Sequence, residues 1–253
     1  MKNKKYIFLY FLLCGLISLH TFALNCGKKN LPIKQQKYSQ EICMLLEEIA
    51  RDIKHTAYLT GVSKLSQKVY ESLQKTPRQD FVQNEDKKRA YKNRPLPIGF
   101  GQTISQPYIV ALMTELLQTQ KNHTVLEVGT GSGYQAAVLS PLVKQVYTLE
   151  IIKELGELTA PKLKEYKNVK AYTNKDGWYG LKEKAPFDGI IVTAASSEIP
   201  PDLIKQLKVG GRMVIPVGQP FQTQKLIVLY KKSEKKVEVK DVLAVSFVPF
   251  TRK

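Results

Sequence analysis

The 253-residue sequence has few cysteines and no apolar run long enough to span a membrane. Of its three cysteines, Cys14 falls in an N-terminal apolar segment, which leaves Cys26 and Cys43 for the rest of the chain. Two cysteines are too few for a disulfide framework, and without nearby histidines they do not form a metal site. Because 43% of the residues are apolar, we expect a packed globular domain without a bound metal.

The first 23 residues resemble an export signal. Three lysines precede an uncharged run over residues 6–19, and Thr21 and Ala23 occupy the two positions that a signal peptidase reads. The run is shorter than the roughly 20 residues of a membrane-spanning helix. Removal of residues 1–23 would therefore leave no stable membrane span. The segment predicts a periplasmic or otherwise exported protein. Retention as an anchor or as a cytoplasmic N-terminus is the alternative.

The excess of positive charge does not follow a nucleic-acid-binding pattern. The sequence has 39 Lys and Arg against 22 Asp and Glu, a formal charge of +17, which would suit a polyanionic partner. However, the lysines are spread over the whole chain, and basic and aromatic residues do not alternate as they do in a strand-binding groove. We expect a lysine-rich solvated surface and no nucleic-acid partner.

The chain divides into a linker and one large domain. Residues 24–38 are polar and basic and are predicted to be a linker, and residues 39–253 form the domain. Apolar residues at helical spacing predict helices over 42–53 and 65–73, and a third over 106–117 with Pro107 in its first turn. Prolines and glycines make Arg94 to Gln102 a shaped loop and a candidate active-site wall.

From residue 124 onward, strand and helix patterns alternate. The predicted strands cover residues 124–128, 145–149, 169–172, 189–193, 211–216, 225–230 and about 242–248, with helical patterns between the earlier ones. The last two strands have no helix between them. This pattern predicts an α/β fold with a doubly wound, Rossmann-like parallel sheet, closed by an antiparallel C-terminal hairpin. Ligands are expected at the carboxyl ends of the strands.

The most informative run is a short apolar strand, a three-glycine turn and the opening of a helix. Gly129, Gly131 and Gly133 leave no side chain between the backbone and a ligand at the helix N-terminus. Glu127 precedes this turn. Glu150 ends the second strand 17 positions after the third glycine, where its carboxylate can accept hydrogen bonds from both hydroxyls of a ribose. The G-x-G-x-G spacing fits S-adenosylmethionine better than NAD.

Residues at the ends of the third and fourth predicted strands indicate how the cofactor is held and which atom accepts the methyl group. Asp176 follows the third strand and can bind an adenine amino group, while Trp178 can cover the ring. A turn aspartate before Gly177 is the competing interpretation. The fourth strand lacks the Asn/Asp-Pro-Pro-aromatic cluster of enzymes that methylate exocyclic amino groups. An oxygen atom is therefore the expected methyl acceptor.

The segment LPIGFGQTISQPY over residues 96–108, followed by the glycine turn, resembles the protein-L-isoaspartate O-methyltransferase family. Further matching stretches lie at residues 69–82, 185–188, 192–195, 199–201, 216–218 and 247–250. The resemblance covers about residues 40–253. It implies an S-adenosylmethionine-dependent enzyme that methylates the α-carboxylate of isoaspartyl residues in damaged proteins and peptides, with D-aspartyl residues as a further acceptor. We expect it to act as a monomer.

The resemblance also implies roles for individual residues. Ser105 is similar to the active-site serine of the family. The resemblance implies a cofactor wall of Gln102, Thr103, Ile104 and Ser105, a ribose-binding role for Glu150, and adenine contacts by Asp176 and Gly177. The glycine turn itself adds Glu127, Gly129, Gly131 and Gly133 to the expected cofactor-binding residues. Lys175 departs from the glycine that the family often has before Asp-Gly. Without the resemblance, Ser105 would be interpreted as a helix N-cap before Pro107.

Two other functions remain compatible with these residues. The fold and the cofactor motif do not fix the acceptor, so an O-methyltransferase of another substrate is one alternative. A non-catalytic exported binding protein is the other. The export-like N-terminus is also unusual for an enzyme that uses cytosolic S-adenosylmethionine, which keeps a cytoplasmic location open.

Overall fold

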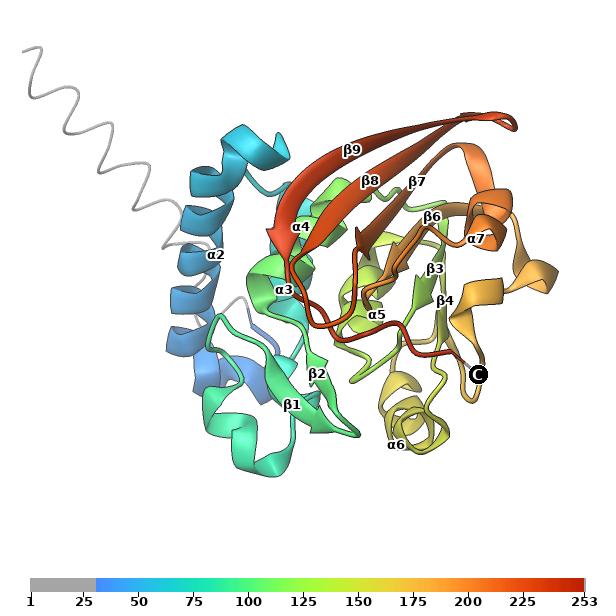
Figure 1. Ribbon diagram of the computed structural model, residues 1–253. Helices are drawn as coiled ribbons and strands as arrows, with labels where there is room; N and C mark the ends of the chain where they lie inside the picture. Colours follow the sequence, from blue (N-terminus) through green and yellow to red (C-terminus); the bar gives the residue numbers. More distant parts are fainter. Residues whose placement is uncertain (1–30, 253) are drawn as a thin grey trace, which may run out of the picture.

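The structure, a computed structural model, describes residues 31–252. The predicted signal at residues 1–23 and the first part of the predicted linker lie outside them. At its centre is a seven-stranded sheet in the order β5-β4-β3-β6-β7-β8-β9, with helices on both faces (Figure 1). Its strands are β3 (Thr124–Val128), β4 (Gln145–Leu149), β5 (Val169–Tyr172), β6 (Phe187–Val192), β7 (Leu207–Val217), β8 (Gln224–Ser233) and β9 (Lys236–Val245).

The sheet has the predicted topology. The strands β5, β4, β3, β6 and β7 pair in parallel, whereas β8 pairs antiparallel with both β7 and β9. The last strand begins earlier than expected, at Lys236 rather than near Val242. The first six residues of β9 are exposed. These residues include no buried side chain that would mark a strand in the sequence. Backbone hydrogen bonds to β8 hold them in the sheet, and neither of their faces is packed against a core.

The helices bury the two faces of the sheet unequally. Successive residues of a strand point to opposite faces, so Val125 joins the core beneath the helices α2 to α6, whereas Leu126 joins a second core beneath α7. Their bounds are α2 (Ser39–Thr60), α3 (Gln67–Lys75), α4 (Pro107–Leu116), α5 (Tyr134–Leu139), α6 (Lys153–Leu163) and α7 (Pro201–Gln206). Pro107 occupies the first turn of α4, as predicted.

Two segments are more ordered than the sequence suggested. The linker predicted at residues 24–38 includes the 3-10 helix Ile33–Tyr38, and Leu31 and Gln35 are buried. The loop predicted from Arg94 to Gln102 is largely a two-stranded antiparallel hairpin of β1 (Leu96–Gly99) and β2 (Gln102–Ile104). Residues 99–101 all have positive φ at its tip, and this tight turn lets the two short strands pair.

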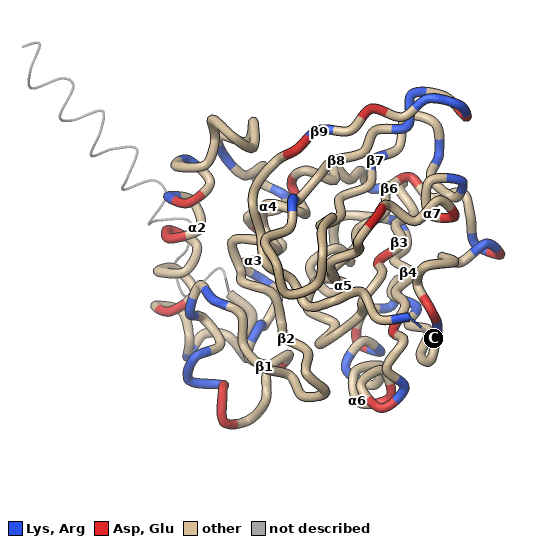
Figure 2. The backbone as a smooth tube through the Cα atoms, in the orientation of Figure 1, with Lys and Arg blue, Asp and Glu red and all other residues tan. Residues whose placement is uncertain are grey.

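The structure also bears on the predictions about membrane spans, surface charge and disulfide bonds. Within residues 31–252, no helix is both long and apolar enough to cross a bilayer. Basic residues are distributed over α2, the loops and the β8–β9 hairpin, and acidic residues lie among them (Figure 2). Cys43 on α2 is disulfide-bonded. The low cysteine count excluded a framework of several bridges, and this single bond does not alter that conclusion.

Candidate active site

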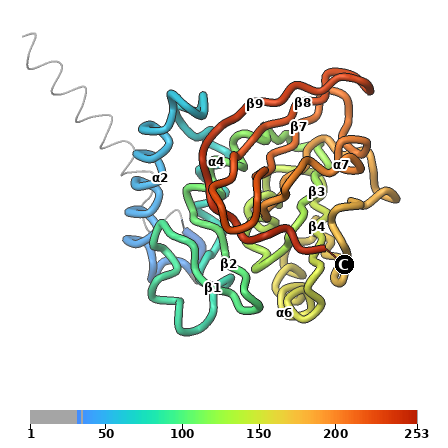
Figure 3. The backbone as a smooth tube through the Cα atoms, in the orientation of Figure 1, coloured from blue at the N-terminus to red at the C-terminus, as the bar shows by residue number. Residues whose placement is uncertain are grey.

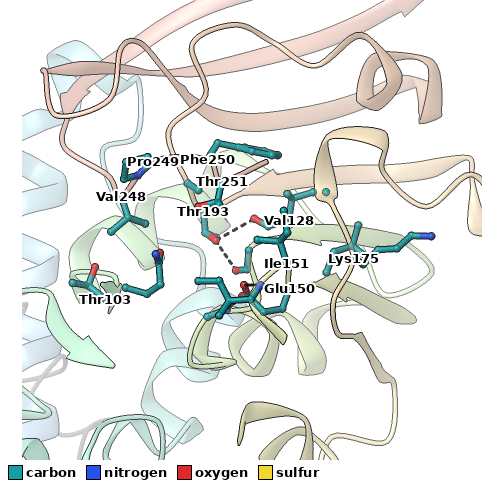
Figure 4. A pocket seen from close by; sticks show the side chains of 17 residues that line it. Thr103, Val128, Glu150, Ile151, Lys175, Thr193, Val248, Pro249, Phe250 and Thr251 are labelled. Carbon is teal, nitrogen blue, oxygen red and sulfur yellow. Dashed lines mark hydrogen bonds between the residues drawn. The ribbon is translucent and has the colours of Figure 1, made fainter. Parts of the chain in front are cut away.

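A cleft lies at the carboxyl ends of β3, β4 and β6. Three neighbouring cavities make up this cleft, and Thr103 and Thr193 line all three. The first lies beside the glycine turn, β4 and the C-terminal residues (Figure 4). The second is a groove of about 740 Å³ that reaches α2, and the third is a small recess around Glu127. Thr103 and Thr193 therefore mark the point where the parts meet.

The glycine turn is held against β6 by a threonine. The Thr193 hydroxyl donates to the carbonyl oxygens of Val128 at 3.1 Å and Gly129 at 2.6 Å (Figure 4). Gly129 has φ +92°, and a Cβ atom there would overlap the Thr193 hydroxyl. Both the backbone angle and the close approach therefore require glycine. Gly129 and Gly131 line the cavity, whereas Gly133 packs against α6 and supports the turn from behind. Their contact with a cofactor stays a prediction.

Glu150 ties the second strand to the glycine turn. One carboxylate oxygen accepts the backbone N–H of Gly131 at 2.8 Å, and the other accepts that of Ile152 at 3.0 Å. The residue is buried yet lines the first cavity. Each carboxylate oxygen has a further lone pair, so the pair remains able to accept two hydroxyl donors. This placement agrees with the predicted ribose-binding role, which stays a prediction.

Glu127 is the most unusual group in the cleft. It is fully buried, and neither carboxylate oxygen has a hydrogen-bond partner among residues 31–252. Burial raises the pKa of Glu127 to about 8, the nearby Thr148 hydroxyl opposes this increase, and the charge of Glu150 adds a smaller increase. The Thr148 hydroxyl is within hydrogen-bond distance of the Thr130 hydroxyl rather than of the carboxylate.

The Glu127 side chain lines the small recess together with Ser105 and Ser132. Burying a carboxylate without a partner costs free energy. A cationic group bound in the recess would offset this cost, because it would attract the ionised form of Glu127.

Ser105 faces both the recess and the groove. It follows β2, and it lines the cavity of Glu127 and the groove of about 740 Å³. The N-cap interpretation is wrong, because the N-cap of α4 is Gln106 and the carbonyl oxygen of the Asn93 side chain accepts the N–H of Tyr108 at 3.0 Å. Within the described part of the chain the Ser105 hydroxyl makes no hydrogen bond, so it can donate to a ligand.

The hairpin residues before Ser105 form one wall of the cleft. Gln102 and Thr103 line the first cavity, and Ile104 lines the recess. Ile104 is buried, which fixes β2 against the core while its neighbours face the ligand space. The predicted wall from Gln102 to Ser105 is therefore assembled in one place.

Asp176 and Gly177 are placed differently from one another. Gly177 lines the first cavity, and a Cβ atom there would overlap the Val128 side chain. The Asp176 carboxylate does not line the cavity. It accepts the backbone N–H of Trp178 at 2.9 Å and the Nε–H of Arg252 at 3.1 Å. Its predicted contact with an adenine amino group stays a prediction.

Sequence reasoning missed the C-terminal part of the site. Residues 247–252, which we call the C-terminal strap, cross the carboxyl ends of the strands (Figure 3). The Ala195 N–H donates to the Val248 carbonyl, and the Phe250 N–H donates to the Ala195 carbonyl, each at 2.8 Å. Phe250, rather than Trp178, lines the first cavity. The motif over residues 247–250 supported the family resemblance but carried no signal that it lies on the cofactor side.

Comparisons with known proteins agree with this geometry. The sequence profile of the protein-L-isoaspartate(D-aspartate) O-methyltransferase family matches residues 50–253. Protein-L-isoaspartate O-methyltransferase 2 of Syntrophobacter fumaroxidans is 50% identical over 216 residues, which cover 85% of this chain and 87% of the relative. Protein-L-isoaspartate O-methyltransferase 2 of a Polaromonas species is 51% identical over 209 residues, or 82% of this chain and 99% of the relative.

Two solved structures show the same fold. A protein-L-isoaspartate O-methyltransferase superposes with a TM-score of 0.69 at 26% identity, and the match covers 81% of this chain and 65% of that one. A Plasmodium falciparum β-aspartate methyltransferase in complex with S-adenosyl-L-homocysteine gives a TM-score of 0.66 at 23% identity, over 82% of this chain and 98% of that one.

Proposed function

The chain belongs to the protein-L-isoaspartate(D-aspartate) O-methyltransferase family, and on this premise we propose that it methylates the α-carboxylate of L-isoaspartyl residues with S-adenosylmethionine as donor. D-Aspartyl residues are a second class of acceptor. The product ester cyclises when the backbone amide nitrogen attacks the ester carbonyl carbon and methanol leaves. Hydrolysis of the resulting succinimide returns part of the material to normal aspartate. The protein would thus start the repair of damaged polypeptides.

The observation that carries this proposal is the meeting of two compartments at Ser105. The recess and the first cavity contain the glycine turn, Glu127 and Glu150, which fit a cofactor with a ribose and a cationic end. The groove on the other side of Ser105 is open and large enough for an extended peptide. A hydroxyl between donor and acceptor compartments is where an acceptor oxygen must be oriented.

Placement is the main task of the protein in this reaction. When bound, S-adenosylmethionine supplies an electrophilic methyl group whose carbon–sulfur bond breaks as the carboxylate oxygen bonds to the carbon. A carboxylate is already ionised at neutral pH, so no general base is needed. Ser105 donates a hydrogen bond to the second carboxylate oxygen and fixes the orientation of the first. Such alignment can contribute several kcal/mol, with about 7–11 kcal/mol as the upper range.

A matched pair of peptides tests the proposal. The purified protein is incubated with labelled S-adenosylmethionine and either an isoaspartyl peptide or the same sequence with a normal aspartyl residue. We expect base-labile label on the isoaspartyl peptide alone. Binding of the cofactor without methylation of either peptide would identify an O-methyltransferase with another acceptor. Absence of cofactor binding would instead favour a non-catalytic binding protein.

We further propose that the protein is exported and functions as a monomer. The lysine-led apolar segment supports export, and so does the disulfide bond of Cys43, because such bonds persist in oxidising compartments. Cys26 is the one other cysteine that cleavage after Ala23 would leave.

Fractionation of cells and N-terminal sequencing of the natural protein test the location. An N-terminus at Leu24 in the periplasmic or secreted fraction would support export, and an intact Met1 in the cytoplasm would overturn it. Light scattering behind a sizing column tests the monomer, for which a mass near twice 28.7 kDa would be the contrary result.

A further inference from the structure

The C-terminal strap is anchored at its end by one arginine. The Arg252 guanidinium donates from Nε to the Asp176 carboxylate and from Nη2 to the Tyr179 hydroxyl, both at 3.1 Å. The backbone of the strap is held by the hydrogen bonds of Ala195 described above. Arg252 therefore connects the last residues of the chain to the loop after β5, on the opposite side of the cofactor cavity.

The same arginine organises a stack of aromatic rings. Its guanidinium carbon lies 4.2 Å from the ring centroid of Trp178 and 5.2 Å from that of Tyr179. The Trp178 ring meets Phe250 edge to face, with centroids 6.1 Å apart and an interplanar angle of 89°. Phe250 in turn lines the cavity beside Gly177. A cation over an indole face is an attractive contact that adds to the ion pair.

The cavity beneath the strap is small in this arrangement. It has a volume of about 60 Å³, whereas pockets that bury a small-molecule ligand usually enclose about 300–1,000 Å³. Four strap residues, Val248 to Thr251, form part of its wall. An adenosyl group needs more room than this, and the strap, whose end is held by the Arg252 side chain, is one part of the wall that can provide it.

We propose that Arg252 is a positioning residue that holds the C-terminal strap over the adenine end of the cofactor, and that it thereby sets how fast S-adenosylhomocysteine leaves. This inference rests on the proposed function, because it requires that the cavity bind an adenosyl group. Arg252 acts through Phe250 and Asp176 and takes no part in methyl transfer. Asp176 would then serve the cofactor mainly by anchoring the strap.

The strength of the Arg252–Asp176 interaction should depend on the salt concentration and on the geometry of the guanidinium group. The Arg252 side chain is 38% exposed, whereas that of Asp176 is 10% exposed, so the pair is accessible to screening by dissolved ions. The two donors and the planar face of arginine are used together. A lysine at position 252 would retain the positive charge but could not form both hydrogen bonds and the planar contact with Trp178. A methionine would retain only an apolar side chain of similar length.

Stopped-flow measurement of S-adenosylhomocysteine release tests the proposal. We expect Arg252→Met to increase the dissociation rate constant at least fivefold, with Arg252→Lys between it and the unaltered protein. The rate of methyl transfer in a single turnover should not change, because Arg252 lines neither the groove nor the recess. Raising the salt concentration should speed release from the unaltered protein and have little effect on Arg252→Met. An unchanged dissociation rate in Arg252→Met would overturn the inference.

A matched control lies at the far end of the sheet. Lys232 pairs with Glu238 at 3.1 Å and lies 4.2 Å from the ring centroid of Tyr230, so Lys232→Met removes a similar cation far from the strap. It should leave release unchanged. Asp176→Asn should accelerate release, and its combination with Arg252→Met should add little further. If the unaltered protein fails to bind S-adenosylhomocysteine, the proposed function itself falls, whereas binding with no effect of Arg252 refutes only the anchor.

Discussion

Glu127 should release a proton when S-adenosylmethionine binds. With its pKa raised to about 8 by burial, the carboxyl is about nine-tenths protonated at pH 7. S-adenosylmethionine carries a sulfonium and an ammonium group, and a nearby positive charge favours the ionised carboxylate. Lowering the pKa of Glu127 by about two in the complex would correspond to about 2.7 kcal/mol of favourable coupling.

The sign of the pH dependence follows directly. Because the free protein holds the proton below about pH 8 and the complex already releases it above about pH 6, affinity rises with pH between these two values. The increase should approach tenfold per pH unit around neutrality and level off above pH 8. Isothermal titration calorimetry in two buffers of different ionisation enthalpy measures the number of protons released. At pH 7 this number should be about 0.8, because about nine-tenths of the carboxyls are protonated in the free protein, with the pKa of Glu127 at about 8, and about one-tenth in the complex.

Two comparisons separate this mechanism from others. Glu127→Gln mimics the protonated carboxyl and should bind S-adenosylmethionine with the same affinity at pH 6 and pH 8. S-adenosylhomocysteine lacks the sulfonium charge and should release fewer protons. Equal binding enthalpies in both buffers, together with a flat pH profile in the unaltered protein, would refute the reasoning and leave Glu127 as a neutral buried group.

Three substitutions test the rest of the cleft. Ser105→Ala should lower turnover about tenfold or more with nearly unchanged cofactor affinity; equal losses in kinetics and calorimetry would show that Ser105 is structural. Glu150→Ala should weaken cofactor binding by about 1–3 kcal/mol, and an unaltered dissociation constant would remove its ribose role. Gly129→Ala should lower the melting temperature more than Gly210→Ala, because both residues have positive φ but only Gly129 adjoins Thr193; equal melting temperatures would contradict this.

The fold was predictable because its buried strands have strong apolar patterns. The strands over 124–128, 145–149 and 169–172 match their predicted bounds. Burial explains this for β3, which is buried from its second residue onward, as expected of a parallel strand covered on both faces. The edge strand β5 has no buried residue and was predicted from its position in the strand–helix alternation. The start of β9 and the hairpin over residues 96–104 were not predicted. Their residues are held by backbone pairing and by a positive-φ turn, which leave little trace in hydrophobic periodicity.

The site was predictable where one short motif carries it. The glycine turn and Glu150 lie on adjacent parallel strands, so the sequence order alone brings them together. Thr193 and Phe250 come from distant segments, and only the sheet order β3-β6 and the path of the C-terminal strap place them at the cavity. The unpartnered state of Glu127 also needed the structure, because burial of its carboxyl depends on its surroundings in three dimensions.

The groove beside Ser105 sets a demand on the polypeptides that this chain acts on. It is a recessed channel between α2, the β1–β2 hairpin and the end of β9, and a chain must enter it extended. A damaged residue held inside its own folded domain cannot reach that depth. Modified sites in loops, tails and transiently opened regions will therefore react first. For a folded substrate protein, the rate of repair will depend on how often the region around the damaged residue unfolds locally.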